Sequence, residues 1–532
     1  MYLIIPGRHH LLTQFQFKYL YALSQSKLSE VKDVNGNKIT DNQPIEGIIF
    51  AVTSANHCGT KRNPIPFYLR AMIIQEFSKD LDVPVYVFGI DDVGYLENFA
   101  SYTLKQIAHQ SEYTLQLNPE NTYVVCSSPV MNMYEKLGFK ILPAELEDRT
   151  KQIFKANHPW QLLEQIASKE RWEYDLEIIE SLHPSSYKLW KTYNLGGMVK
   201  SILNDAIIGD DGDLTESRDY NTYVRQMDEI AELKYQETVP HINPGLIGDI
   251  GGAVGSWIKC ASEEAKLSES DFYGIEVARQ LFNICKQRKE NGEFNNPNVF
   301  FAQKNAVTNL VFRPNTMNTI HTSSLTHEME SDGSREDLLR FIENRYEELR
   351  PGGVWINRDV VGPEDGDKKI LMSLLSNDGE NDWEQQTENY IQQTEYLSGL
   401  SSQARFLRFA TDFRSEEDDR ISYKMEEINE KSYVKISLRD AAEFLLTKLT
   451  KDYIDNWESE MHERFCNWSI NDWKEVLESK GFKVDLNSRS YLNPWIEENR
   501  LKGKAELFTV KDGDLVPHEF PPSNMLVIAR KY

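Results

Sequence analysis

The stretch "LIGDIGGAVGSW", residues 246–257, is the feature that most constrains how this chain can fold. Its apolar start predicts a short buried strand, and the strand ends in a turn that contains Gly251, Gly252 and Gly255. Glycines at such a turn let a ligand lie against the backbone where a side chain would collide with it. The pattern therefore predicts alternating strands and helices with a ligand site at the end of this strand.

A second apolar run, "FYGIEV", ends at Glu276. An acidic residue that closes the next strand can accept hydrogen bonds from both ribose hydroxyls of a nucleoside. A nicotinamide cofactor would favour the order G-x-G-x-x-G. Here the order is Asp-x-Gly-Gly-x-x-Gly, beginning at Asp249. The sequence therefore predicts an adenosine-containing cofactor of another kind.

This order resembles motif I of the class I S-adenosylmethionine-dependent methyltransferases. Three later segments resemble that family in the same order, namely "FFAQKNAVTN", "MNTIHTSSLTHEM" and "LRPGGVWINRDV". One departure is Ala253, a small residue where the family usually has its middle glycine. The resemblance implies S-adenosyl-L-methionine as the cofactor and a set of residues that contact it. These are Asp249, Gly251, Gly252, Gly255, Glu276, Asn305, Ala306 and Ser323.

The catalytic candidates come from two places. One is the loop "HTSSLTHEM", and the other is the end of "LRPGGVWINRDV", which is the fifth expected strand of the methyltransferase-like part. Methyl transfer requires alignment of donor and acceptor, and a general base only if the acceptor loses a proton. His327 is the candidate base because the ordinary pKa of histidine lies near neutrality. Glu328 is a second candidate in this loop near the sulfonium, and Asp359 could contact the acceptor. The alternatives are that His327 orients the loop, Glu328 lies on a helix surface, and Asp359 caps a turn.

The first 150 residues alternate strand and helix patterns, which predicts an α/β doubly wound domain. The segment "IIPGRHHLLTQFQFKYL" resembles the start of the HxGH nucleotidyltransferase superfamily, closest to the nicotinamide-mononucleotide adenylyltransferases. Phe15 and Gln16 stand where that family has a glycine and its last histidine. The domain is therefore either an active transferase with altered phosphate contacts or a degenerate domain that binds a nucleotide or only packs.

The resemblance implies a nucleoside triphosphate with Mg²⁺ as a second ligand. His9, His10, Lys61 and Arg62 could supply positive charge, or could be a polar strand end and a solvated loop. No resident metal site is expected. The nucleotide-binding residues that the resemblance implies are Gly7, Arg8, His10, Thr13, Gln16, Lys61, Arg70, Asp91 and Ser127.

Composition narrows the class of partner. The formal net charge of −24 disfavours nucleic acid and favours a small molecule or a protein. No apolar run is long enough to cross a membrane, and the N-terminus does not read as a signal peptide. Five scattered cysteines without a CxxC pair predict a reducing, cytoplasmic setting. The sequence makes no prediction of the oligomeric state.

The expected organisation is α/β with two doubly wound Rossmann-like domains joined by a helical segment. We expect a nucleotidyltransferase-like domain over 1–150, helices over 151–240 that link to and begin the second domain, and a methyltransferase-like domain over 241–532. Residues 363–432 are polar enough to predict an inserted lid without a core of its own. The leading hypothesis is a bifunctional enzyme. Its alternatives are a methyltransferase with an inactive N-terminal domain that recognises the acceptor, and a non-catalytic cofactor-binding or scaffold protein.

Overall fold

The structure is a computed structural model of the chain. It describes residues 1–25, 28, 31–40, 43–93, 96–126, 130–144, 146–148, 153–154, 159–169, 171–203, 220–307, 309–385, 387, 390–414, 420–450 and 457–532. The chain divides into two compact units, Met1–Thr215 and Glu216–Tyr532. Within the described residues, no helix combines the length and apolar character that crossing a membrane requires.

The first unit is built on a five-stranded parallel sheet, which agrees with the predicted α/β class. The strand order is β3-β2-β1-β4-β5. Both faces of this sheet bury apolar side chains, as parallel sheets require, because their crossover helices cover them. The strands are β1 (Tyr2–Gly7), β2 (Gly47–Thr53), β3 (Val85–Ile90), β4 (Thr122–Cys126) and β5 (Lys140–Pro143).

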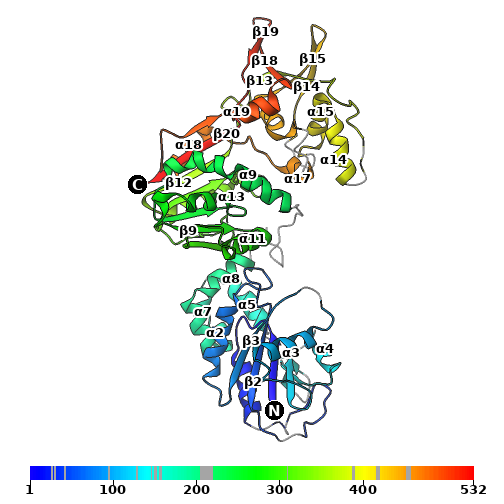
Figure 1. The fold of residues 1–532 in the computed structure, drawn as a ribbon, viewed down its shortest axis with the longest axis vertical. Helices are drawn as coiled ribbons and strands as arrows, with labels where there is room; N and C mark the ends of the chain where they lie inside the picture. The colour runs from blue at the N-terminus through cyan, green and yellow to red at the C-terminus, as the bar shows by residue number, and fades with distance from the viewer. Residues whose placement is uncertain are drawn as a thin grey trace. The chain divides into compact units, whose positions relative to one another are not determined.

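Helices cover this sheet on both sides (Figure 1). On one side, α1 (Gln14–Ser24) and α2 (Phe67–Ser78) share a core with β1 and β2. On the other side, α3 (Phe99–Gln110) and α4 (Met131–Glu135) share a core with Ile4 and its neighbours. Two short strands, β6 (Leu146–Asp148) and β7 (Ile153–Phe154), pair antiparallel with each other.

The helical segment expected over 151–240 does not behave as one linker. Its first helices bury Leu162, Ile166 and Trp190 in the same core as β1 and α2, so this part completes the first unit. The apolar faces of these helices explain the difference, because a free linker would leave them exposed. The elements are α5 (Pro159–Ser168), a 3-10 turn (Trp172–Tyr174), α6 (Leu176–Ser181), α7 (Pro184–Thr192) and α8 (Leu195–Leu203). The next helix, α9 (Tyr220–Thr238), belongs to the second unit.

The second unit contains a central sheet in the order β10-β9-β8-β11-β12-β20-β16, with β17 also paired to β20. Strands β8 to β12 run parallel, and β20 runs antiparallel to β12. Numbered in chain order without β17, this is 3-2-1-4-5-7-6, and the last strand, β20, is reversed relative to the parallel strands. The strands are β8 (Leu246–Ile250), β9 (Asp271–Glu276), β10 (Val299–Gln303), β11 (Met317–Ser323), β12 (Leu349–Val360), β16 (Phe482–Val484), β17 (Arg489–Tyr491) and β20 (Asn524–Lys531).

Alternating side chains of β12 face two separate cores, as a pleated strand requires. Trp355 packs against α13 (Arg335–Glu348) and α18 (Ile470–Ser479) on one side of the sheet. Ile356 packs in a core with Tyr235 of α9 and with α10 (Ser256–Ser262) on the other. Helices α11 (Arg279–Glu290) and α12 (Thr326–Asp332) complete this part.

The polar segment 363–432 places no described strand in the central sheet, but it does not lack a core. Together with later residues it builds a second, antiparallel sheet in the order β14-β15-β13-β18-β19. Ile370, Phe406 and Phe409 are buried there. The few apolar residues of a polar segment can therefore form a core when apolar residues from elsewhere in the chain pack against them. The segment "AELFTV" forms β18, which belongs to this second sheet.

The strands of this second sheet are β13 (Lys369–Leu374), β14 (Lys424–Ile428), β15 (Lys431–Ser437), β18 (Ala505–Lys511) and β19 (Asp514–His518). Its helices are α14 (Tyr390–Gly399), α15 (Ser402–Asp412), α16 (Leu438–Glu443), α17 (Trp457–His462) and α19 (Pro494–Ile496), with π-helical turns at Phe444–Lys448 and Glu497–Leu501.

Candidate functional site

The glycine-rich turn after β8 has the backbone that its sequence predicts. Gly251 and Gly255 have φ angles of 68° and 75°, in the left-handed region that glycine tolerates without cost. Ala253 also lies there, with φ 51°. The turn therefore survives the departure from the family pattern, at a cost of about 1 kcal/mol for a left-handed alanine.

At two positions of this turn an added side chain would clash with a neighbouring side chain as it now lies. A Cβ on Gly252 would lie 2.2 Å from Oδ2 of Asp249. A Cβ on Gly251 would lie 2.9 Å from the side chain of Leu325, in the loop that follows β11. The turn thus brings bare backbone against the ends of two neighbouring strands.

Asp249, the last residue but one of β8, is held by a histidine that the sequence analysis missed. Nδ1 of His321 and Oδ1 of Asp249 are 2.7 Å apart, and both side chains are buried. The His321 ring stacks on the indole of Trp257 with centroids 4.0 Å apart. The pair forms because β11 runs beside β8 with His321 opposite Asp249. The role of His321 depends on this strand register, so no local sequence motif could have predicted it.

Three polar atoms at this edge of the sheet are buried without a hydrogen-bond partner in the described part of the chain. They are Oδ2 of Asp249, Nε2 of His321 and Oγ of Ser323. Buried polar groups in proteins are almost always paired, because an unpaired one costs about 1–3 kcal/mol. The carboxyl ends of β8 and β11 are thus suited to a polar ligand.

Glu276 closes β9, as predicted, and is buried. Its Oε1 accepts hydrogen bonds from the backbone N–H groups of Val277 and Ala278 at 2.8 and 3.0 Å. Burial raises the pKa of this carboxyl to about 7. Asn305 and Ala306 follow β10, and both are buried.

These two residues after β10 are partly used by the protein itself. Oδ1 of Asn305 accepts a hydrogen bond from the N–H of Val307 at 2.8 Å, which shapes the turn. Ala306 packs in the apolar core beside β8. The predicted cofactor residues therefore lie on the ends of β8, β9, β10 and β11, which are adjacent strands.

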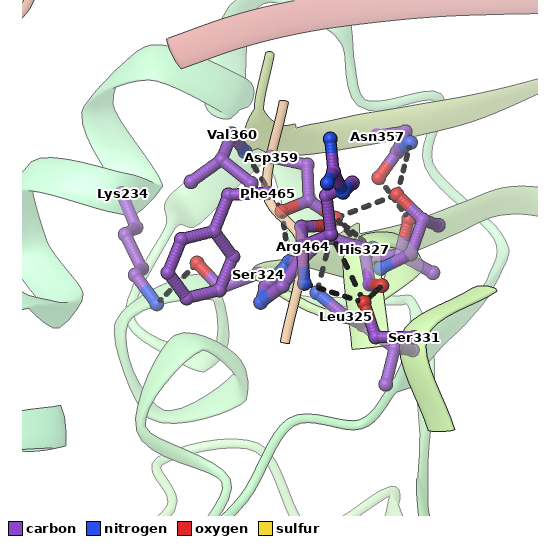
Figure 2. A network of polar contacts seen from close by, with 12 residues as sticks. Lys234, Ser324, Leu325, His327, Ser331, Asn357, Asp359, Val360, Arg464 and Phe465 are labelled. Carbon is purple, nitrogen blue, oxygen red and sulfur yellow. Dashed lines mark hydrogen bonds and ion pairs between the residues drawn. The ribbon is translucent and has the colours of Figure 1, made fainter. Parts of the chain in front are cut away.

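On the other side of the same edge, the partly buried His327 pairs with the buried Asp359 (Figure 2). Nδ1 of His327 lies 2.7 Å from Oδ1 of Asp359. Burial opposes the charged imidazole, but the Asp359 carboxylate outweighs it and raises the pKa of His327 above its ordinary value. Burial likewise acts to raise the pKa of Asp359, but the His327 cation outweighs it and holds that pKa low.

The carboxylate of Asp359 is fully used within the protein. Its Oδ2 accepts hydrogen bonds from the N–H and Oγ1 of Thr326, both at 2.6 Å, and from the N–H of Leu325 at 3.2 Å. Its Oδ1 also accepts the N–H of Val360 at 2.8 Å. The capping role, which was the alternative for Asp359, is therefore what the structure displays, and the carboxylate orients His327.

Phe465 contacts His327 from the segment that follows α17. The two rings meet edge to face with centroids 4.8 Å apart. The buried carboxylate of Glu443 fixes this segment, because it accepts the N–H groups of Phe465 and Cys466 at 3.0 Å. A cavity of about 20 Å³, enough for a water molecule, lies against His327 and Phe465.

Two further charged residues complete this side. Glu328 is partly buried on α12 and interacts electrostatically with His327 and Glu276. Lys234 reaches in from α9, where its Nζ donates a hydrogen bond to Oγ of Ser324 at 3.5 Å (Figure 2). Burial, with Arg358 nearby, lowers the pKa of Lys234 to about 8. Lys234 lies on a helix outside every motif, so no local pattern indicates a role for it.

In the first unit, the predicted nucleotide residues have other partners. His10 is buried, and its Nε2 lies 3.2 Å from the carbonyl oxygen of Arg62. Burial lowers the pKa of His10 well below its ordinary value, and lowers that of His9 to about 4. Both imidazoles are therefore neutral at physiological pH. In that state they would not supply positive charge to a phosphate.

Thr13 and Gln16 form a capping box at the start of α1. Oγ1 of Thr13 accepts the N–H of Gln16 at 3.1 Å, and Oε1 of Gln16 accepts the N–H of Thr13 at 2.9 Å. Gln16 thus stands in a local helix-capping role where the family's histidine would meet phosphate. The same loop is bonded to the later helices, since Oγ of Ser186 accepts the N–H of Leu12 at 2.7 Å.

Arg70 is fully buried and serves the sheet. Its guanidinium donates hydrogen bonds to the carbonyl oxygens of Arg8, Thr53 and Ser54 at 2.8–2.9 Å, which ties together the ends of β1 and β2. This contradicts its predicted role in phosphate binding, because the side chain is enclosed.

The remaining predicted nucleotide residues lie on loops that follow the strands. Gly7 ends β1 and is followed by the exposed Arg8, Lys61 is partly exposed in the loop after β2, and Asp91 is exposed directly after β3. Ser127 lies outside the described residues. Across the part of the chain that the structure describes, no three His, Cys, Asp or Glu side chains cluster as metal ligands.

No protein-family model matches the sequence, and neither does any curated protein. Solved structures do resemble it in fold. The YcgJ protein from Bacillus subtilis is 11% identical over 57% of this chain and 98% of its own, with a TM-score of 0.29. SAM-dependent methyltransferases from Methanosarcina mazei and Thermotoga maritima are each 12% identical. The first covers 56% of this chain and 96% of its own with a TM-score of 0.27. The second covers 59% and 96% with a TM-score of 0.28. Sequence identities and TM-scores this low support no inference about the reaction of this chain.

Proposed function

We propose that the chain is an S-adenosylmethionine-dependent methyltransferase that acts on a small molecule. One observation carries the proposal: Asp249, His321 and Ser323 present buried polar atoms without partners in the described chain, beside a glycine turn whose backbone lies close against the side chains of Asp249 and Leu325. These atoms suit the polar amino-acid part of the donor. Glu276, at the end of the adjacent strand, suits its ribose hydroxyls.

When bound, the donor supplies an electrophilic methyl group on a sulfonium sulfur. The chain's part is to bind donor and acceptor in line and to keep water from between them. Phe465 packs against His327 at this place and contributes apolar cover. A displacement of this kind requires no acid or base when the acceptor atom already has a free lone pair.

The pairing with Asp359 changes the expected role of His327. Near neutral pH the imidazole keeps its proton, because Asp359 raises its pKa. A protonated imidazole donates through both nitrogens, so Nε2 would donate a hydrogen bond to the acceptor. It becomes a general base only when the pH exceeds its raised pKa. His327 therefore suits an acceptor that arrives as an anion or with a free lone pair.

We propose for the first unit the role of recognising a nucleotide or acceptor, without fast nucleotidyl transfer. The neutral imidazoles of the partly buried His9 and the buried His10 support this alternative over the bifunctional one, because phosphoryl chemistry relies on positive charge near the phosphates.

Calorimetric titration with S-adenosylmethionine and S-adenosylhomocysteine tests the proposed function. Wild-type protein should bind both, and Asp249→Ala and Glu276→Ala should each bind more weakly. Glu506→Ala, an exposed carboxylate on β18, is the control and should bind like wild type. Absence of binding to wild-type protein would contradict the proposal. Mass spectrometry of small molecules that copurify with the chain, before and after addition of donor, would reveal the acceptor as a species heavier by one methyl group.

A further inference from the structure

The ammonium group of Lys234, on α9, points at the loop between the two halves of the site, where it donates a hydrogen bond to Ser324 (Figure 2). Its neighbours by electrostatic interaction come from both halves: Asp249 on the donor side, and Asp359 and Glu328 on the acceptor side. It thus lies where donor and acceptor would meet.

The polar environment of Lys234 is incomplete. Its only hydrogen bond to a described residue is the long one to Ser324, and none of the described carboxylates forms an ion pair with it. Asp359 cannot turn toward it, because both of its oxygens are held by α12 and His327. A partly buried cation is unfavourable when the carboxylates around it form no direct ion pair with it, and a ligand that brings an anion into contact relieves that cost.

We propose that Lys234 is a carboxylate-binding residue of the methyl-transfer centre, pairing with the carboxylate of a bound ligand. This inference rests on the proposed function. Either of two ligands could carry this carboxylate: the donor, at its amino-acid end, or the acceptor, in an acid group. In either case Lys234 fixes the position of a ligand beside Ser324, where the methyl group would move.

The test compares wild type with Lys234→Met, Lys234→Arg and a control, Lys511→Met, which removes an exposed lysine of β18. Two nucleosides are titrated by calorimetry: S-adenosylhomocysteine, which carries the carboxylate, and methylthioadenosine, which lacks it. If the donor is the source, Lys234→Met should weaken S-adenosylhomocysteine binding by about tenfold or more. Methylthioadenosine binding should stay unchanged, and Lys234→Arg should restore part of the loss.

If the acceptor is the source, S-adenosylhomocysteine binds both proteins equally, and benzoate is titrated onto the protein saturated with it. Wild type and Lys511→Met should then bind benzoate, and Lys234→Met should bind it about tenfold more weakly or not at all. Equal behaviour of Lys234→Met and wild type toward both carboxylates would overturn the inference while leaving the proposed function intact. Failure of wild type to bind either nucleoside would instead overturn the proposed function.

Discussion

The carboxylate of Asp359 joins the start of α12 to the ring of His327. One oxygen accepts the N–H of Thr326 at 2.6 Å, and the other lies 2.7 Å from Nδ1 of His327. A single buried side chain at the end of β12 therefore sets both the position of the helix that carries His327 and the charge of its imidazole.

Replacement of Asp359 by Asn should separate these effects. The amide keeps one acceptor oxygen but no charge, so burial would no longer be offset and the pKa of His327 should fall below its ordinary value. Unfolding in urea should show a loss of about 3 kcal/mol, typical for a broken buried ion pair. Asp472→Asn alters the capping box of the surface helix α18 and should cost no more than about 1 kcal/mol. An unchanged His327 titration by NMR would show that Asp359 does not control it.

The same pair predicts a pH dependence of stability. The pKa of His327 is higher in the folded protein than its ordinary value of 6.5, so the folded state binds the proton more tightly. Its stabilising contribution is fully present below pH 6.5 and is lost as the pH rises through the raised pKa. The free energy of unfolding of wild type should fall over this alkaline range more than that of His327→Gln. Parallel curves for the two proteins would contradict the assignment.

Two glycines with similar backbone provide a matched test of the cofactor turn. Gly255 and Gly292 have φ angles of 75° and 73°, so alanine at either pays the same left-handed cost of about 1 kcal/mol. A Cβ on Gly255 would lie 3.1 Å from the ring of Phe301, whereas nothing lies within 4 Å of one on Gly292. Gly255→Ala should weaken S-adenosylhomocysteine binding, and Gly292→Ala should not. Equal affinities would show that the turn is not part of the donor site.

Glu276 should couple donor binding to pH. Oε1 of Glu276 already accepts two backbone N–H groups, so both ribose hydroxyls must donate to Oε2, which can accept them only while it is unprotonated; affinity for S-adenosylhomocysteine should therefore fall as the pH drops below about 7. In the unliganded protein a raised carboxyl pKa favours the protonated folded state. Glu276 should therefore lower stability as the pH rises from 4.5 to about 7, and Glu276→Gln should abolish both effects. Calorimetry and urea unfolding across this range measure them, and a pH-independent affinity would argue against ribose contact.

The sequence could predict those parts of the site that depend on neighbours along the chain. The glycine turn and Glu276 follow from local strand ends, and the strand order then brings them together at one edge. His321 and Lys234 could not be predicted in this way. The first owes its role to strand register with Asp249, and the second to the packing of a preceding helix over the sheet.

In the first unit, a motif resemblance located residues along the chain but did not predict what they do. The motif resemblance identified Arg70 and His10 by position, but their function depends on burial, which local sequence does not reveal. Arg70 is enclosed with three backbone carbonyl oxygens, and His10 is buried beside it with a lowered pKa. Likewise, the core around Ile370 and Phe406 assembles from segments far apart in sequence. The polarity of 363–432 alone therefore led to the wrong prediction that this segment lacks a core.

These burials lead to a prediction for nucleotide chemistry in the first unit. Nicotinamide-mononucleotide adenylyl transfer should be slow or absent, because Gln16 is a neutral amide engaged in capping α1 and the nearby His10 is neutral. Nucleotide binding should be retained, with the exposed Arg8 and the partly exposed Lys61 as its cations. Pyrophosphate release from ATP or CTP, with a panel of phosphorylated acceptors, measures the first part, and thermal unfolding with each nucleotide measures the second. Fast adenylyl transfer would show that Gln16 and a neutral His10 suffice for catalysis, and failure of every nucleotide to raise the unfolding temperature would show that the unit binds none.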